Sequence, residues 1–410
     1  MTYPDSVRFL YALGNEIKTA KLGLERIGIL LAALGYPERA FRSVHVAGTN
    51  GKGSTSAMIE SGLRAAGVRT GLFTSPHLIE PTELIRVDSV PVTAAQFEQA
   101  FNTVHQTAEK LNLDCHPTYF ETVTAMGFWL FRELGVETAV VEAGMGGRLD
   151  ATNVLNPALT VITPIDFDHE AFLGHTLESI TSEKAGILKT RVPAVFARQR
   201  PEVWTVLVER AAALNVPVTR AESFEIRDFR LDARGSYFSG FHCALPGEHQ
   251  AGNAIAAIQA LALLGVSWES IAQGLEETRW PGRLEHVSPN PDIILDGAHN
   301  PAAARALAQY LTRFYSNRKL WIVYGAMRDK AIEEIGAILF PLASELIFTA
   351  PNYSRALRPQ ALADIAGRGR VASDIAAALD LIRAEASPED AVLITGSLFL
   401  VGEARRLFVK

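Results

Sequence analysis

The stretch Gly48-Thr49-Asn50-Gly51-Lys52-Gly53-Ser54 decides the fold, because of what lies on either side of it. Before it, residues 43–47 form a short apolar run rich in β-branched residues, which predicts a buried strand. After it, residues 54–66 place apolar side chains at helical spacing, and Gly67 is a plausible stop. A strand, a Gly-rich turn and a helix in this order predict the first βαβ unit of an α/β protein.

The Gly-rich turn itself has the composition of a phosphate-binding loop. Glycines let the backbone approach phosphate oxygens, and the helix that follows offers unpaired N–H groups. Lys52 adds a cation, and Ser54 can meet a phosphate or its metal ion. The strict GxxxxGK[ST] pattern is not matched, because Val46 stands at its first Gly and Gly53 separates Lys52 from Ser54. The alternative is a Gly-rich turn without a ligand, but the flanking strand and helix favour phosphate binding.

The rest of the chain repeats the strand and helix alternation twice. In the first part, strands are expected at residues 68–74, 138–141 and 160–163, and a helix at 254–264. In the second part, strands are expected at residues 292–296, 319–324, 345–349 and 390–395. The turn-forming segment Ser288-Pro289-Asn290-Pro291 between them is interpreted as a linker. We therefore predict an ATP-binding domain at 1–287 with a mostly parallel sheet, and a smaller Rossmann-like domain at 288–410.

Length and composition are those of a folded globular protein, and the charge does not favour nucleic-acid or membrane partners. The 410 residues exceed the usual domain of about 150 residues, and 48% are hydrophobic. A net charge of -6 does not attract phosphate backbones or anionic membranes. Cys115 and Cys243 form no CxxC pair, so they indicate neither a disulfide framework nor a zinc site. Because the start of the chain lacks a signal-peptide pattern, we expect a cytoplasmic protein, and we expect it to be a monomer.

Polar residues follow the predicted strands of the first part. Glu142 ends an apolar strand before the Gly-rich stretch 143–153 and could hold Mg²⁺, or it could cap the next turn. His169 follows the strand at 160–163, and Ser75 follows the strand at 68–74. Since parallel strands end at one sheet edge, all three are candidate ligands beside the phosphate loop.

Lys184 lies in Glu183-Lys184-Ala185-Gly186-Ile187, interpreted as a helix start followed by a short loop. A lysine in such a place is ordinarily solvated. In a desolvated site its pKa would fall, and its free amine could react with CO₂ to form a carbamate. A carbamate would be an anionic oxygen ligand for a second Mg²⁺.

Taken together, these motifs resemble the folylpolyglutamate synthase branch of the Mur ligase superfamily. The resemblance covers nearly the whole chain and is carried by residues 46–54, 74–78, 142–153, 183–187, 280–285, 295–301 and 395–397. It implies that Ser75, Glu142 and His169 bind Mg²⁺ and that Lys184 is carbamylated. It also implies ATP contacts from the 48–54 loop, Asn253, Arg283 and Asp296, with His299 near the cleft between the domains.

The resemblance also implies where the acceptor binds. The segment Thr118-Tyr119-Phe120-Glu121 resembles the pterin-facing segment, and Leu22-Gly23-Leu24-Glu25-Arg26 resembles a second substrate segment, with Leu22, Gly23 and Leu24 as the expected contacts. Leu149 is assigned to the substrate site as well. The alternative for these segments is a core aromatic pair and an amphipathic helix end. Lys21 stands where the family often has an acidic residue.

The implied reaction is ATP-dependent joining of L-glutamate to a folate-type carboxylate through an acyl phosphate. Dihydropteroate and reduced folates are the expected acceptors, and folate extension alone is the alternative. A Mur ligase of peptidoglycan synthesis is less favoured, because it needs an additional N-terminal domain for its uridine-diphosphate sugar substrate. The 47 residues before Gly48 are too few for a domain with its own core. A nucleotide-binding scaffold is also less favoured, since it needs no second set of metal ligands. Product chain length, preferred folate form and monovalent-ion dependence do not follow from the sequence.

Overall fold

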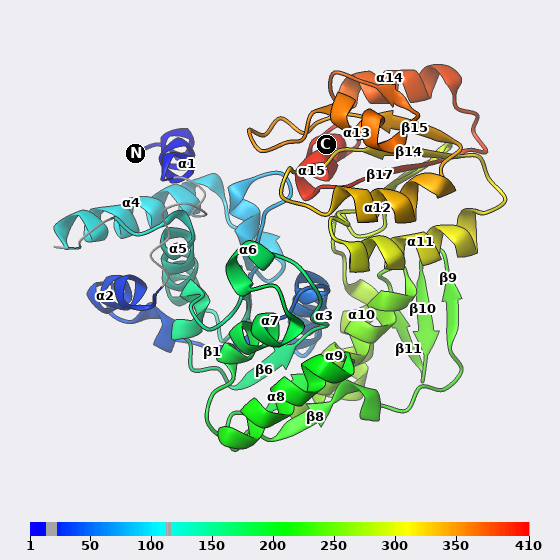
Figure 1. Ribbon diagram of the computed structural model, residues 1–410. Coiled ribbons are helices and arrows are strands. Elements are labelled where there is room, and N and C mark those ends of the chain that lie inside the picture. Colours follow the sequence, from blue (N-terminus) through cyan, green and yellow to red (C-terminus); the bar gives the residue numbers. More distant parts are fainter. Residues whose placement is uncertain (14–22, 112, 114–115, 410) are drawn as a thin grey trace. The chain divides into compact units, whose positions relative to one another are not determined.

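The computed structural model describes residues 1–13, 23–111, 113 and 116–409, and their contacts divide the chain into two compact units (Figure 1). Unit 1 comprises Met1–Ile226 and Gly252–Thr278, and unit 2 comprises Arg227–Ala251 and Arg279–Lys410. Both units are built from helices and sheets, so the predicted α/β class is confirmed. The boundary expected at 287/288 lies within unit 2.

Unit 1 is a sheet covered by helices. Its helices are α1 (Tyr3–Ala12), α2 (Glu25–Ala33), α3 (Lys52–Ala65), α4 (Ala94–Lys110), α5 (Tyr119–Glu133), α6 (Glu170–Leu173), α7 (Leu177–Lys184), α8 (Pro201–Ala213), α9 (Glu248–Leu263), which continues from unit 2, and α10 (Trp268–Glu277). Its strands are β1 (Arg42–Ala47), β2 (Thr70–Phe73), β3 (Ile85–Val87), β4 (Val90–Pro91), β5 (Thr138–Glu142), β6 (Leu159–Ile162), β7 (Ala194–Phe196) and β8 (Val218–Arg220). The strands predicted at 43–47, 138–141 and 160–163 are confirmed within one residue at each end.

The sheet of unit 1 has the order β4-β3-β2-β5-β1-β6-β7-β8 across the described residues. The strands from β2 to β8 in this order run parallel, and β3 and β4 are antiparallel additions. Val46 of β1 pairs with Glu142 of β5 and with Val161 of β6. The carboxyl ends of β2, β5, β1 and β6 therefore meet at one edge, which is where parallel α/β sheets bind ligands.

Helix α3 starts at the Gly-rich loop and is buried along its length. Gly51 precedes it with φ 84°, a left-handed conformation that a glycine adopts without strain. Lys52 and Gly53 are already helical, so the helix predicted at 54–66 starts two residues early. On α10, a Cβ at Gly274 would lie 2.5 Å from the Cα of Gly62. Glycine at this crossing lets the backbones of α3 and α10 pack in direct contact. This packing fixes the position of α3, whose first turn follows the Gly-rich loop.

Unit 2 holds an antiparallel sheet and a mostly parallel one. The first has the order β11-β10-β9, from β9 (Arg230–Asp232), β10 (Gly235–Phe238) and β11 (Phe241–Cys243). The second has the order β12-β13-β17-β14-β15-β16, from β12 (Glu285–Pro289), β13 (Asp292–Leu295), β14 (Leu320–Tyr324), β15 (Glu345–Phe348), β16 (Arg370–Val371) and β17 (Ala391–Thr395). Its helices are α11 (Pro301–Tyr315), α12 (Ile332–Leu339), α13 (Pro359–Ala366), α14 (Ile375–Glu385) and α15 (Leu398–Arg406). The strands predicted here are confirmed within one residue.

The linker predicted at Ser288-Pro289-Asn290-Pro291 is wrong. Ser288 and Pro289 belong to β12, which pairs antiparallel with β13, and residues 290–291 are the turn between the two strands. Proline and asparagine favour a tight turn within a domain as much as a connection between domains. Composition alone therefore does not separate the two cases.

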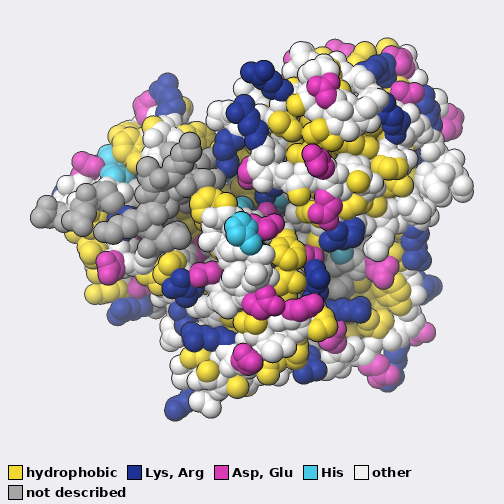
Figure 2. Space-filling model, in the orientation of Figure 1, with side chains coloured by type: hydrophobic (Ala, Val, Ile, Leu, Met, Phe, Trp, Pro, Cys, Tyr) yellow, Lys and Arg dark blue, Asp and Glu magenta, His cyan; other side chains and the backbone are white. Residues whose placement is uncertain are grey.

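The surface carries both charge signs. On the face that Figure 2 shows, acidic and basic side chains are interspersed, in keeping with the small net charge of -6. In the part of the chain that the structure describes, no helix combines the length and the apolar character needed to cross a bilayer.

Candidate active site

The Gly-rich loop between β1 and α3 is anchored to the segment that follows β6. The backbone N–H groups of Thr49 and Asn50 both donate to the carbonyl oxygen of Pro164, at 2.9 and 3.1 Å. A Cβ at Gly48 would lie 2.0 Å from Oγ1 of Thr163, so no larger residue fits at this point. The loop therefore has a defined path over the carboxyl ends of β1 and β6.

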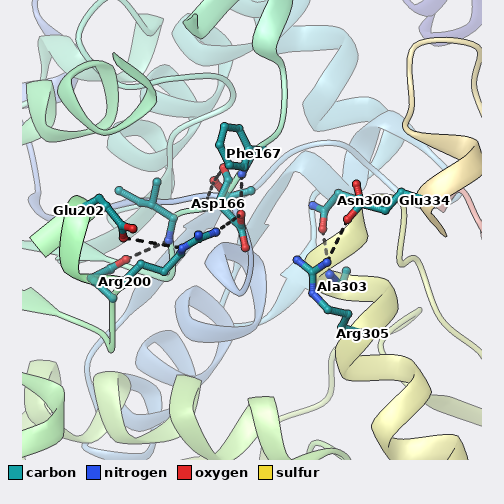
Figure 3. A network of polar contacts seen from close by, with 11 residues as sticks. Asp166, Phe167, Arg200, Glu202, Asn300, Ala303, Arg305 and Glu334 are labelled. Carbon is teal, nitrogen blue, oxygen red and sulfur yellow. Dashed lines mark hydrogen bonds and ion pairs between the residues drawn. The ribbon is translucent and has the colours of Figure 1, made fainter. Parts of the chain in front are cut away.

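The side chain of Thr49 adds a second anchor to the same segment. Its hydroxyl donates to the carbonyl oxygen of Asp166 at 2.9 Å and accepts from the Asp166 N–H at 3.1 Å. The Asp166 carboxylate faces Arg200 at 3.5 Å, and Arg200 also approaches Glu202 at 3.9 Å (Figure 3). Asp166 and Arg200 support the loop, and neither was predicted as a site residue.

The first turn of α3 has the features of an anion site. Its leading N–H groups have no acceptor within the helix, and the helix dipole makes this end electropositive. The Lys52 amine lies 3.3 Å from the Thr49 carbonyl oxygen, to which it donates, and 3.8 Å from Oε1 of Glu142. A cation and a buried carboxylate thus stand side by side where β1 and β5 end.

Asn253 of α9 reaches the same loop. A Cβ at Gly51 would lie 2.3 Å from Oδ1 of Asn253, so the amide side chain packs directly on the Gly51 backbone. Asn253 is buried. A residue 202 positions away in the sequence is therefore part of the loop's surroundings, and the ATP contact expected for it stays a prediction.

The three predicted metal ligands follow neighbouring strands. Ser75 comes two residues after β2 and is half-buried, and Glu142 is the last residue of β5 and is buried. His169 lies farther from its strand, as the exposed N-cap residue of α6 with φ 53°. Its backbone N–H donates to Oδ1 of Asp168 at 2.9 Å. Ser75 and Glu142 are thus held at the sheet edge, and His169 is held on the loop beyond it.

Lys184 is the last residue of α7, so the interpretation of its segment as a helix start is wrong. The helix starts at Leu177, after Thr176, whose hydroxyl accepts from the Ser179 N–H in a capping box. Lys184 is buried, and its amine donates to the Gly48 carbonyl oxygen at 2.8 Å. Burial, with a smaller effect of the Lys52 charge, lowers the pKa of Lys184 to about 7. The amine is therefore available as a nucleophile near neutral pH.

The loop after Glu142 is locked to the segment that holds Lys184. The Arg148 N–H donates to the Glu183 carbonyl oxygen at 2.7 Å, and the Arg148 guanidinium pairs with the Glu183 carboxylate at 2.8 Å. A Cβ at Gly186 would lie 2.4 Å from the Cα of Arg148. Leu149, assigned to the substrate, follows on this loop and is half-buried. Glycine at position 186 is thus required by the contact between the two segments.

Asp150 was missed as a site residue. It is buried, and its carboxylate accepts from the N–H groups of Met145 and Thr152, both at 3.0 Å. Burial raises its pKa. The sequence gives a signal for the bond from Thr152, because an aspartate side chain commonly accepts from the backbone N–H two residues later in a turn. Asp150 shapes the loop between Glu142 and Asn153.

The two predicted acceptor segments meet through one buried ion pair. The carboxylate of Glu121 lies 3.1 Å from the Arg26 guanidinium, and it also accepts from the Thr118 N–H at 2.8 Å as part of a capping box. The segment at 118–121 is therefore the start of α5 and not a free loop. Gly23 and Leu24 precede α2, with Leu24 as its N-cap residue. Leu22 and Lys21 lie outside the described residues.

The aromatic residues of the acceptor segment already have ring partners. Tyr119 stacks on Tyr11, with centroids 6.1 Å apart and planes 10° apart. The Phe120 ring lies 6.0 Å from that of Phe73, at the end of β2. These contacts agree with the alternative of a core aromatic pair, although both rings remain half-buried and not enclosed.

In unit 2, Arg283, Asp296 and His299 gather around one turn. The Asp296 carboxylate accepts from the Leu284 and Ala298 N–H groups, both at 2.9 Å. The His299 Nδ1 donates to the Gly297 carbonyl oxygen at 2.8 Å, and a Cβ at Gly297 would lie 2.4 Å from Nη1 of Arg283. These three predicted residues therefore belong to one cluster at the carboxyl end of β13.

Helix α11 begins directly after this cluster. Asn300 caps it by accepting from the Ala303 N–H at 2.9 Å, and farther along α11 Arg305 pairs with Glu334 of α12 at 3.1 Å (Figure 3). These contacts hold the first turn of α11, and with it His299, in a defined position.

Two family models match this chain. The Mur ligase middle domain matches residues 46–261, and the glutamate ligase domain of Mur ligases matches residues 282–398. The fold and the Gly-rich loop at a parallel sheet edge, together with these matches, define the class of protein: the chain is a Mur ligase.

Curated proteins and solved structures narrow the class. The chain is 36% identical to dihydrofolate synthase/folylpolyglutamate synthase of Mycobacterium tuberculosis, over 94% of this chain and 90% of that protein. It is 35% identical to the enzyme of the same name from Bacillus subtilis, over 94% and 95%. A Mycobacterium tuberculosis folylpolyglutamate synthase complexed with ADP and AMPPCP superposes with a TM-score of 0.92 at 33% identity, covering 100% of this chain and 99% of that one. The chain belongs to the dihydrofolate synthase/folylpolyglutamate synthase family.

Proposed function

We propose that this chain is an ATP-dependent ligase that joins L-glutamate to dihydropteroate and to reduced folates. The names of its relatives support both acceptors, and solved relatives hold ADP with AMPPCP or, for Escherichia coli FolC, ADP with DHPP. That FolC structure superposes with a TM-score of 0.89 at 31% identity, covering 99% of this chain and 97% of that one.

One observation carries the proposal: the carboxyl ends of β2, β5, β1 and β6 lie next to one another, and the phosphate loop and its polar neighbours follow directly from them. ATP would place its phosphates against the first turn of α3, where N–H groups and Lys52 offset their charge. The loop contacts of Thr49 and Asn253 would keep this cradle in shape without the ligand.

The first chemical step activates the acceptor. Its carboxylate oxygen attacks the γ-phosphorus of ATP, and the bond from that phosphorus to the bridging oxygen breaks. The products of this step are ADP and an acyl phosphate of the acceptor. Lys52 and the N–H groups of α3 stabilise the charge that moves onto the leaving phosphate oxygens. The acceptor is then activated for amide formation, which a free carboxylate does not undergo at neutral pH.

The polar residues at the edge fit magnesium ions. Glu142 offers a buried carboxylate, Ser75 a hydroxyl and His169 an imidazole, and oxygen donors are what Mg²⁺ prefers. The Lys184 amine adds to the carbon of CO₂ and releases a proton, and the resulting carbamate oxygen could serve a second Mg²⁺. When bound, Mg²⁺ would neutralise phosphate charge during transfer. The low pKa and buried position of Lys184 support this assignment.

The second step forms the amide. The free amine of L-glutamate attacks the acyl carbon and gives up one proton to water. The tetrahedral oxyanion collapses, and inorganic phosphate leaves with the C–O bond pair. His299, oriented by its bond to the Gly297 carbonyl oxygen, would hold the amine through its other ring nitrogen. Arg283 and Asp296 would contact the nucleotide.

The acceptor would lie near the start of α5. The half-buried rings of Tyr119 and Phe120 offer a face for a pterin. Because Glu121 is already paired with Arg26, its part would be to hold α5 and α2 together more than to bind the ring directly. Gly23, Leu24 and Leu149 would complete this part of the site.

A glutamate-incorporation assay with dihydropteroate and tetrahydrofolate in parallel tests the proposal. We expect ADP release that depends jointly on L-glutamate and on either acceptor. Activity with tetrahydrofolate alone would leave a folylpolyglutamate synthase, the name carried by the Lacticaseibacillus casei relative at 33% identity. ADP release without amide formation, or with neither acceptor, would contradict the proposal. A monomeric state, a cytoplasmic location and the absence of a nucleic-acid partner stay predictions.

A further inference from the structure

A second group of metal-ligating side chains lies away from the strand edge. Within the described residues, His105, Glu109 and His116 form the one group of three or more His, Cys, Asp or Glu side chains whose ligand atoms all lie within 4.8 Å of one another. His105 and Glu109 are one turn apart on α4, so they share a face of that helix. His116 comes from the segment between α4 and α5.

We propose that His105, Glu109 and His116 bind a divalent transition-metal ion of the zinc type, which ties the end of α4 to the start of α5. Two imidazoles and one carboxylate are a donor set that zinc accepts, with a water in the fourth position. A site with two imidazoles favours zinc and its neighbours over magnesium and calcium, which prefer sites made mostly of oxygen ligands.

Hydrogen bonding prepares His116 as a ligand. Its Nδ1 lies 2.8 Å from the Pro117 carbonyl oxygen, and because a carbonyl only accepts, Nδ1 carries the proton. In the neutral ring, Nε2 then carries the lone pair. It accepts a hydrogen bond from Nδ1 of His105, 3.4 Å away, and lies 3.8 Å from Oε1 of Glu109, so an ion would take the place of the shared proton. A backbone carbonyl on the second nitrogen is the usual support of a metal-bound histidine.

Ring contacts hold both imidazoles in place. Phe101 stacks on His105 with centroids 5.4 Å apart, and Phe9 of α1 meets His105 at 4.7 Å and His116 at 5.5 Å, edge to face in both cases. Rings fixed in this way lose little conformational freedom when an ion binds.

The distances allow an ion after a small adjustment. Ligand atoms about 2.0 Å from a tetrahedral zinc ion lie about 3.3 Å from each other. The pair His105 and His116 is already at 3.4 Å. The Glu109 carboxylate lies 3.8 Å from Nε2 of His116 and within 4.8 Å of the His105 ligand atom, so it needs to approach by at most about 1.5 Å, which its exposed side chain can do. The competing explanation is a histidine pair joined by a hydrogen bond, with no ion.

The cluster lies next to the start of α5, so a bound ion would affect the position of that helix. His116 precedes by two residues Thr118, the N-cap of α5, whose first turn carries Tyr119 and Phe120. An ion that bridges His116 to α4 would fix the start of α5 relative to α4. It would therefore stabilise unit 1 without taking part in glutamate transfer.

Zinc binding to the full chain tests the inference. The protein is stripped with a chelator and titrated with Zn²⁺ against a coloured competing chelator, with millimolar Mg²⁺ present throughout to occupy sites that prefer oxygen donors. The variants are His105→Phe, which keeps a ring against Phe9 and Phe101, and Glu109→Gln and His116→Gln. We expect each to weaken one zinc site at least about tenfold. The matched control His242→Ala, a histidine of β11, is expected to leave that site unchanged.

Two further measurements complete the test. The triple variant combines His105→Phe, Glu109→Gln and His116→Gln. Zn²⁺ is expected to raise the Tm of the wild type and not that of the triple variant. Co²⁺ is expected to give visible absorption bands only when the three ligands are present. Cys115→Ser, at a position outside the described residues, controls for binding by that thiol. If the triple variant binds zinc like the wild type, or if the wild type binds none, the inference is wrong and the histidines are only a hydrogen-bonded pair.

Discussion

The amine of Lys184 donates a 2.8 Å hydrogen bond to the carbonyl oxygen of Gly48, 136 residues away in the chain. This contact joins the end of α7 to the first residue of the phosphate loop. A buried amine is costly unless it has such a partner or loses its charge, and Lys184 does both near neutral pH. The lysine proposed as a metal ligand is therefore also part of the loop's support.

Replacing Lys184 with alanine should abolish most amide synthesis while the protein stays folded. The variant loses both the proposed carbamate ligand and the bond to Gly48, and we expect the rate to fall by about 100-fold or more. Steady-state ADP release and circular dichroism check the two parts. The matched control is Lys189→Ala, which removes a lysine bonded to the Asn153 carbonyl oxygen at 2.9 Å, and its activity should stay within a few-fold of wild type. Full activity of Lys184→Ala would contradict the proposed role.

Lys184 should also make stability depend on pH. Its pKa is about 7 when folded and 10.5 ordinarily, so between these values the unfolded chain binds a proton that the folded chain does not. The contribution of this residue to the free energy of unfolding therefore rises with pH through that window. Relative to Lys184→Met, the wild type should gain about 1.4 kcal/mol per pH unit. Urea unfolding of both proteins in CO₂-free buffer from pH 7.5 to 9.5 measures the difference, and parallel curves would contradict it.

Lys52→Ala should weaken ATP use and shift the pH profile. The variant removes the cation beside the phosphate loop, so we expect the KM for ATP to rise about tenfold or more. The Lys52 charge is also one cause of the low pKa of Lys184, so that pKa should rise in the variant. The acidic limb of the activity profile is then expected to move to higher pH. If the rate falls but the acidic limb stays at the same pH, the Lys52 charge does not control the protonation of Lys184, and the prediction is wrong.

Gly51→Ala and Gly67→Ala form a matched pair at the two ends of α3. Both glycines have positive φ, 84° and 81°, so alanine at either costs about 1 kcal/mol or more in backbone strain. A Cβ at Gly67 meets nothing within 4 Å, whereas one at Gly51 would strike Asn253. We expect both to lower the free energy of unfolding and only Gly51→Ala to weaken ADP binding, as measured by calorimetry. Equal ADP affinity in the two variants would remove Asn253 from the nucleotide site.

Arg26→Met should destabilise unit 1 by about 3 kcal/mol, because it leaves the Glu121 carboxylate buried without its cation. The matched control is Arg8→Met, which breaks the exposed pair with Asp5 and should leave the free energy of unfolding almost unchanged. Chemical denaturation of the three proteins gives both values. If the two variants lose similar amounts of free energy of unfolding, the buried pair of Arg26 and Glu121 stabilises unit 1 no more than an exposed pair does.

Eight strands, among them β5 and β14, could be predicted from the sequence because each is a short apolar run with a clear end. The phosphate loop could be predicted for the same reason, since its flanking elements are unambiguous. The strands β3, β4, β7 to β12 and β16 were not predicted. The start of α7 was missed because its capping box uses Thr176 and Ser179, a weaker signal than a charged N3 residue.

Long-range side-chain pairs could not be predicted from local patterns. Arg26 and Glu121 are 95 residues apart, and neither segment shows that the other is its partner. The hairpin at 288–291 was taken for a linker because turns within and between domains use the same residues. What the sequence leaves open is therefore which segments meet, because burial and pairing are decided by the whole fold.

The contact between Phe120 and Gly144 links two regions described separately above. A Cβ at Gly144 would lie 2.6 Å from the Phe120 ring, so the ring rests on bare backbone two residues after Glu142. Any molecule that pushes this ring must also press on the strand end that carries the carboxylate. If the proposed acceptor site is right, a ring stacked on Phe120 would bear on the backbone that follows Glu142, so binding of the acceptor and the position of this carboxylate would be coupled.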